Sequence, residues 1–114
     1  MREPDTSDVQ FLAVNTAASG SASTVTLPTP ASTERNVIDA VYASCSVAPT
    51  GGVIITITNV QGASGAVTWS QDITAAGPAP FYFREPGLRG ILGAAMVISM
   101  TDGTTAKDLN VAYR

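Results

Sequence analysis

Apolar and polar side chains alternate with a period of two along most of this chain, which is the pattern of β-strands that bury one face. The alternation is clearest where Val53, Ile55 and Ile57 share one parity and Thr56 and Thr58 the other. It is interrupted by short segments rich in Gly, Pro, Ser and Asn, which are typical of turns. The segments that read as strands are 9–14, 24–27, 36–47, 53–60, 67–73, 81–83, 96–101 and 109–113.

Helix is expected to be nearly absent, because no window of twelve or more residues carries a 3.6-residue apolar stripe. Seven or eight short strands separated by turns predict a small antiparallel all-β domain, either a β-sandwich or a jelly-roll-like fold. The strands do not repeat one another in sequence, which argues against a solenoid. We therefore expect one domain over residues 9–114.

Three segments carry more specific expectations. Residues 36–47 have apolar side chains on both parities, which predicts a bulge or a strand buried on both faces. The Gly-rich turn at 48–52 and the strand after it predict a hairpin. Residues 75–80 hold two prolines and are expected to interrupt the sheet, and the next three residues should place Phe81 and Phe83 on one face and Tyr82 on the other.

Charge is scarce: 13% of the residues are charged and 45% are hydrophobic, against about 25% charged in ordinary soluble domains. No charged residue occurs between Asp39 and Asp72, yet this stretch is no membrane span, because Thr, Ser, Asn and Gly interrupt its apolar residues. The composition predicts a nearly neutral exterior suited to lasting contact with neighbouring proteins.

The residues needed for most chemistry are missing. The 114 residues include no histidine, and the one cysteine, Cys45, forms no intrachain disulfide and is expected to be a small buried hydrophobe. The net charge of −3 argues against nucleic-acid binding. The acidic residues lie in separate segments without a calcium-loop spacing, so we predict no metal, no cofactor and no membrane association.

One cluster, residues 81–90, combines aromatic and charged side chains. Arg84 and Glu85 are adjacent and would point to opposite faces of a strand, and neither a second carboxylate nor a nucleophile motif accompanies them. We therefore predict an interface loop and no enzyme activity, with the arginines suited to bidentate contacts with acidic groups. An alternative use of the aromatics is sugar stacking, for which the candidates are Tyr42, Trp69, Tyr82 and Tyr113.

Residues 1–8 hold four of the fifteen charges and one proline, which predicts a flexible N-terminal arm, or one that becomes ordered against a partner subunit. They contain no apolar stretch of signal-peptide length, so synthesis and retention in the cytosol are expected.

Four segments resemble a group of small virion proteins of tailed bacteriophages and prophages, and the resemblance extends over residues 9–114. It implies a β-sandwich carried on the virion, most plausibly a head decoration or cement protein outside the major capsid shell, and it brings no catalytic residues. The four segments are the Gly51-Gly52 turn with its following strand, Asp72 to Phe81, Leu88-Arg89-Gly90 and the closing Leu109 to Arg114.

The expected partners are the major capsid protein and further copies of this chain, with a trimer at local three-fold positions favoured. The alternatives are a tail fibre or baseplate module that binds a host glycan, a capsid or tail-tube subunit, and an enzyme with two carboxylates in a cleft. The predicted contact residues are Arg2, Pro4, Asp5, Phe11, Phe81, Tyr82, Arg84, Glu85, Leu88 and Arg89.

Overall fold

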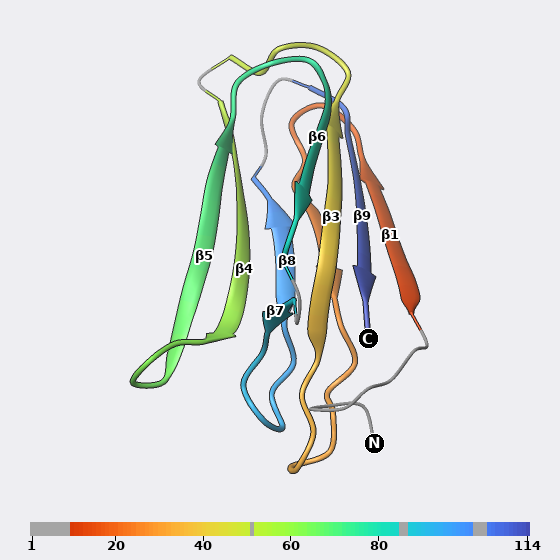
Figure 1. The fold of residues 1–114 in the computed structure, drawn as a ribbon. Coiled ribbons are helices and arrows are strands. Elements are labelled where there is room, and N and C mark those ends of the chain that lie inside the picture. The colour runs from red at the N-terminus through yellow and green to blue at the C-terminus, as the bar shows by residue number, and fades with distance from the viewer. Residues whose placement is uncertain (1–9, 51, 85–86, 102–104) are drawn as a thin grey trace.

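A computed structural model describes residues 10–50, 52–84, 87–101 and 105–114, which form two antiparallel sheets without any helix (Figure 1). In the first sheet the order is β1-β9-β3-β6, with β7 also pairing with β3, and in the second it is β2-β8-β4-β5. The strands are β1 (Phe11–Ala17), β2 (Ser23–Thr26), β3 (Val37–Cys45), β4 (Val53–Gln61), β5 (Ala66–Ile73), β6 (Gly77–Tyr82), β7 (Leu88–Arg89), β8 (Val97–Met100) and β9 (Lys107–Tyr113).

The strand order is that of a jelly roll. The chain is one long antiparallel hairpin in which β1 pairs with β9, β2 with β8, β3 with β7 and β6, and β4 with β5. Rolling this hairpin up distributes its strands over two sheets. Because β6 and β7 follow each other along the same strand, β3, they act as one interrupted strand and reduce nine strands to eight. The predicted all-β sandwich or jelly-roll class is confirmed.

The core lies between the sheets and follows the predicted parities. Val53, Ile55 and Ile57 of β4 are completely buried, and Trp69 of β5 contacts Phe81 and Phe83 at ring-centroid distances of 5.4 Å each. These three rings close the sandwich where β5 and β6 form its edge. The other buried apolar residues include Ile38, Val41, Ala43, Cys45, Met96, Ile98, Met100, Leu109 and Val111.

The hairpin predicted at residues 48–52 is wrong. Its two flanking strands, β3 and β4, lie in different sheets, so this connection crosses from one sheet to the other. Alternation fixes which side chains of a strand are buried but not which strand pairs with it. The next connection along the chain is a tight hairpin between β4 and β5, in which Gly62 N–H donates to the carbonyl of Gly65.

Two other expectations concern strand irregularities. The bulge predicted in residues 36–47 is confirmed, because the pairing of β3 with β9 shifts between Ile38 and Ala40. The interruption predicted for residues 75–80 is wrong from Gly77 onward, since β6 includes Pro78 and Pro80. A proline lacks an N–H but is tolerated in an edge strand, where one side of the backbone has no partner strand. The arm at residues 1–8 lies outside the described residues.

A polar cluster covers one end of the core. The Lys107 side chain is buried beside Cys45, its register partner on β3, and Lys107 Nζ donates to the carbonyl of Thr105 at 2.8 Å. The Thr105 hydroxyl accepts from Val47 N–H at 3.1 Å and lies 3.3 Å from the Ser46 hydroxyl. These bonds tie the end of β3 to the start of β9.

The environment of Cys45 predicts a loss of stability at alkaline pH. Burial raises the pKa of the Cys45 thiol, and the positive charge of Lys107 opposes this effect in part. The folded state keeps the thiol proton to a higher pH than the unfolded chain. The contribution of Cys45 to the free energy of unfolding is therefore complete below the unfolded pKa of about 8.5 and declines as the pH rises further. In urea titrations with reductant, the stability advantage of the wild type over Cys45→Ala should be smaller at pH 10 than at pH 7. An unchanged difference would contradict this assignment.

Candidate interaction surface

The outer face of the first sheet is the most distinctive surface of the described residues. Side chains on directly opposite residues of paired strands point to the same face, so the register defines rows across β1, β9, β3 and β6. We call this surface the aromatic face. Its two apolar rows are Leu12, Ala112, Ala40 and Tyr82, and then Val14, Asn110, Tyr42 and Pro80.

Large side chains on the aromatic face are exposed. Leu12 is 63% exposed, Val14 58% and Tyr82 69%, while Tyr42 is 40% exposed. The rings of Tyr42 and Tyr82 meet edge to face with centroids 5.8 Å apart. Isolated exposed apolar residues are normal on any protein, but a contiguous group of them often marks an interaction site.

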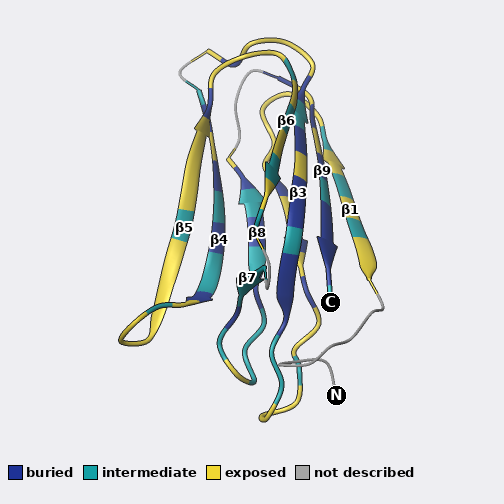
Figure 2. Ribbon diagram, viewed as in Figure 1, coloured by how far each residue is buried: buried dark blue, intermediate teal, exposed yellow. Residues whose placement is uncertain are grey.

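The outer face of the second sheet has a different character. One row across its four strands carries four hydroxyl side chains, and we call this surface the hydroxyl face. The Thr24 and Ser99 hydroxyls are 3.1 Å apart and hydrogen bonded. Figure 2 shows that β5, at the edge of this sheet, is exposed along most of its length. The row consists of Thr24, Ser99, Thr56 and Ser70.

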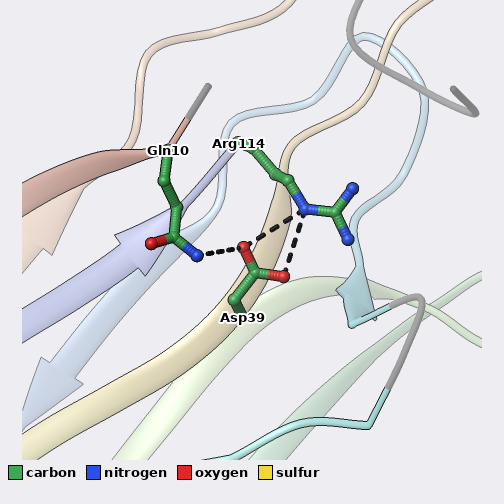
Figure 3. Close-up of polar contacts among 3 residues, drawn as sticks. All are labelled: Gln10, Asp39 and Arg114. Carbon is green, nitrogen blue, oxygen red and sulfur yellow. Dashed lines mark hydrogen bonds and ion pairs between the residues drawn. The ribbon is translucent and has the colours of Figure 1, made fainter. Parts of the chain in front are cut away.

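One ion pair, between Asp39 and Arg114, lies near the aromatic face. Asp39, at the β3 bulge, accepts hydrogen bonds from Arg114 Nε at 3.2 Å to each carboxylate oxygen and from Gln10 Nε2 at 2.9 Å (Figure 3). These bonds from Gln10 and Arg114 to Asp39 link the start of β1, the bulge in β3 and the end of β9. A third row, which follows the two apolar ones, consists of Thr16, Asp108, Ser44 and Pro78, and Asp108 is the one charged residue in the three rows. The face therefore offers a partner apolar contact with little charge to desolvate.

The structure separates the predicted contact residues of the 81–90 cluster. Tyr82 is on the aromatic face and Arg84 is exposed, whereas Phe81 points into the sandwich against Trp69. Leu88 and Arg89 are partly buried in β7, where they pair with Ile38 and Val37.

Of the remaining predicted contact residues, Phe11, at the start of β1, is the one that the structure describes. Phe11 is 45% exposed and packs on the Tyr113 ring, with centroids 5.5 Å apart. Arg2, Pro4, Asp5 and Glu85 lie outside the described residues. Leu12 and Val14 fall within residues 1–14, which we favoured as a contact region, but they were not named individually, and Tyr42 was predicted as a sugar-stacking candidate and not as a protein contact. The signal was present, because apolar residues occur on both parities of β1 and β3, and a strand with one buried face then exposes the other set.

The chemistry available on the described residues is limited. A hollow of about 330 Å³ lies where β1 and β3 end and β9 begins, and its lining contains one carboxylate, Asp108, with hydroxyls such as those of Thr16 and Ser44. No group of three or more metal-ligating side chains occurs in the described part of the chain. Nor does that part contain a helix long and apolar enough to cross a bilayer.

The fold and these surfaces define a jelly-roll β-sandwich with exposed apolar and aromatic side chains on the aromatic face, and with a row of hydroxyls beside an exposed Ile54 on the hydroxyl face. No family model matches the chain, and no curated protein sequence matches it. The chain is similar to a crystal structure of PirA, with a TM-score of 0.48 and 8% identity over 98% of this chain and 99% of that one. It is also similar to the virus-like particle of the giant freshwater prawn (Macrobrachium rosenbergii) extra small virus, with a TM-score of 0.35 and 12% identity over 96% of this chain and 80% of that one. At these scores and identities neither likeness carries an inference about function.

Proposed function

We propose that this chain is a structural protein of a tailed-bacteriophage virion, a head decoration or cement protein bound to the outside of the major capsid shell. The observation that supports it best is the contrast between the two exteriors of the sandwich. A protein that is solvated on one side and docked on the other needs one hydrated face and one face suited to burial. The hydroxyl face and the aromatic face fit these two roles.

The low charge of the aromatic face fits a cementing role. Contacts between capsid and decoration protein are formed in many copies and hold by area and shape complementarity. Leu12, Val14 and Tyr82 can be covered without stripping water from charged groups. The partner in this proposal is the major capsid protein, and the sequence resemblance to small phage virion proteins supports the same assignment. The chain's location in this proposal is the virion, after synthesis in the bacterial cytoplasm.

Decoration of particles that lack this protein tests the proposal. Wild-type protein is expected to bind the head exterior in electron micrographs and to raise the temperature at which particles release DNA. Tyr82→Asp should bind at least about tenfold more weakly, because it places a charge in a desolvated contact. The matched control is Ser70→Asp on the hydroxyl face, which should bind like the wild type. Density on the tail, or an unchanged release temperature with full occupancy, would refute the cement role.

A second candidate function rests on the Tyr42 and Tyr82 pair. Adjacent exposed aromatic rings, here 5.8 Å apart, are suited to stacking against sugar rings. A tail fibre or baseplate module with this platform would bind a glycan of the host surface. Binding of labelled host cells that Tyr82→Ser abolishes, together with tail density, would favour this function over cementing.

A further inference from the structure

Four polar side chains lie together where the aromatic face meets the hollow at the start of β9. Asp108 and Asn110 follow each other on the outward side of β9, and their register partners on β3 are Ser44 and Tyr42. Opposite residues of paired strands have Cβ atoms about 5 Å apart, and successive outward residues of one strand are about 7 Å apart. We call these four residues the polar block.

The side chains of the polar block have no hydrogen-bond partner inside the protein. In the part of the chain that the structure describes, no group forms a hydrogen bond or an ion pair with any of the four. Comparable groups elsewhere are paired, since the Asp39 carboxylate accepts from Gln10 and Arg114. Asp108 is exposed and Ser44 and Asn110 are half-buried. Their carboxylate, hydroxyl and amide groups are therefore available to a ligand.

The hollow gives the Asp108 carboxylate a concave surrounding. Its volume of about 330 Å³ is at the lower end of the range for small-molecule sites, and most of its lining residues are alanines and serines. The other charged residue of the lining, Lys107, is buried, and its ammonium group donates to the Thr105 carbonyl. Asp108 is thus the charge that a ligand in the hollow would meet.

Tyr42 adds an apolar surface directly beside these polar groups. Its ring is 40% exposed and is the register partner of Asn110. A sugar ring has one surface of C–H groups, which packs on an aromatic ring, and an edge of hydroxyls that both donate and accept hydrogen bonds. A carboxylate accepts from two such hydroxyls, and an amide both donates and accepts. The polar block and Tyr42 ring together match both parts of a sugar.

We propose that the polar block and the hollow bind an uncharged oligosaccharide, with one sugar ring stacked on Tyr42 and a neighbouring one seated against Asp108. This inference rests on the second candidate function and deepens it by assigning the class of glycan. Hydrogen bonds from two adjacent sugar hydroxyls to the carboxylate are charge-assisted and correspondingly strong. An acidic sugar would be repelled by Asp108, and no cationic side chain occurs in the three rows of this face.

Titration of the free, isotope-labelled protein with defined trisaccharides, followed by NMR, tests this site. The neutral probes are maltotriose, cellotriose, mannotriose and galactotriose, and the acidic probe is trigalacturonate, which adds carboxylates to the galactotriose framework. At least one neutral probe is expected to bind with a dissociation constant on the order of 1 mM and to shift the backbone amides of residues 42–44 and 108–110. Trigalacturonate should bind at least about tenfold more weakly.

Asp108→Ala is expected to weaken the binding of the neutral probe at least about tenfold, because it removes the charged acceptor. Its affinity for trigalacturonate should not fall. The matched control is Asp72→Ala, which makes the same change in net charge at an exposed residue of β5 in the other sheet, and it should bind like the wild type. Unchanged thermal unfolding would show that both variants fold.

The outcomes separate this inference from the second candidate function. If Tyr82→Ser abolished binding but Asp108→Ala left it unchanged, the tyrosine platform would stand and the site at Asp108 would be refuted. Equal affinity of the wild type for neutral and acidic probes, or equal losses in both aspartate variants, would also overturn the inference. No binding of any neutral probe at about 10 mM would overturn it together with the second candidate function. The cement role would then be judged by the particle experiment alone.

Discussion

Truncation of Ile57 to alanine is expected to lower the free energy of unfolding by about 3 kcal/mol, within the usual range for a buried isoleucine. Ile57 is completely buried in β4, and its register partners are Ile98 on β8 and Trp69 on β5. Neighbours held in two strands cannot fully collapse into the space that the deleted atoms leave. Urea titration followed by Trp69 fluorescence measures the loss.

Ile54→Ala is the control for this prediction. Ile54 is in the same strand but points outward and is 43% exposed, so its truncation removes little buried surface and should cost less than about 1 kcal/mol. Equal losses for the two variants would mean that the parity of β4, and with it the assignment of the core, is wrong.

Gly87→Ala is expected to destabilise the fold by about 3 kcal/mol through two separate effects. Gly87 has a φ of +100°, a conformation that residues with a side chain rarely adopt. A Cβ built there would lie 2.6 Å from Val37 Cγ1 and 3.1 Å from the Ile38 carbonyl oxygen, inside contact distance of β3. Relief of this overlap would require β3 to move away from the segment that precedes β7.

Gly20→Ala separates the two effects. Gly20 has a similar φ of +83°, but a Cβ there would meet no atom within 4 Å. Its substitution should therefore cost about 1 kcal/mol, from backbone conformation alone. The difference between the variants in thermal or urea unfolding reports the steric contact with β3. If Gly87→Ala were no worse than Gly20→Ala, the close approach of this segment to β3 would be refuted.

Local pattern predicted most of the strands but not how they pair. Alternation placed Val53, Ile55 and Ile57 on one buried face, because side-chain parity is a property of the strand itself. Partner choice depends on residues far apart in the sequence, which is why the connection at 48–52 was mistaken for a hairpin. Pro78 and Pro80 were mistaken for a break because their tolerance depends on β6 being an edge strand.

The same limit applies to the interaction surface. Tyr82 was predicted as a contact residue from the aromatic cluster in which it occurs. Leu12, Val14 and Tyr42 come from distant segments and form one face only through the pairing of β1 with β9 and of β9 with β3. The hydroxyl face arises in the same way, from four strands that contribute one side chain each.

The position of β9 has a consequence for how the protein is made. This strand lies between β1 and β3 in the first sheet although it is the last of the nine in sequence. While the ribosome is still synthesising the chain, β1 and β3 have no partner that could join them, and the sheet stays split until β9 leaves the exit tunnel. Folding dominated by such distant pairings is slow, so the nascent chain exposes its apolar strands until β9 has been synthesised.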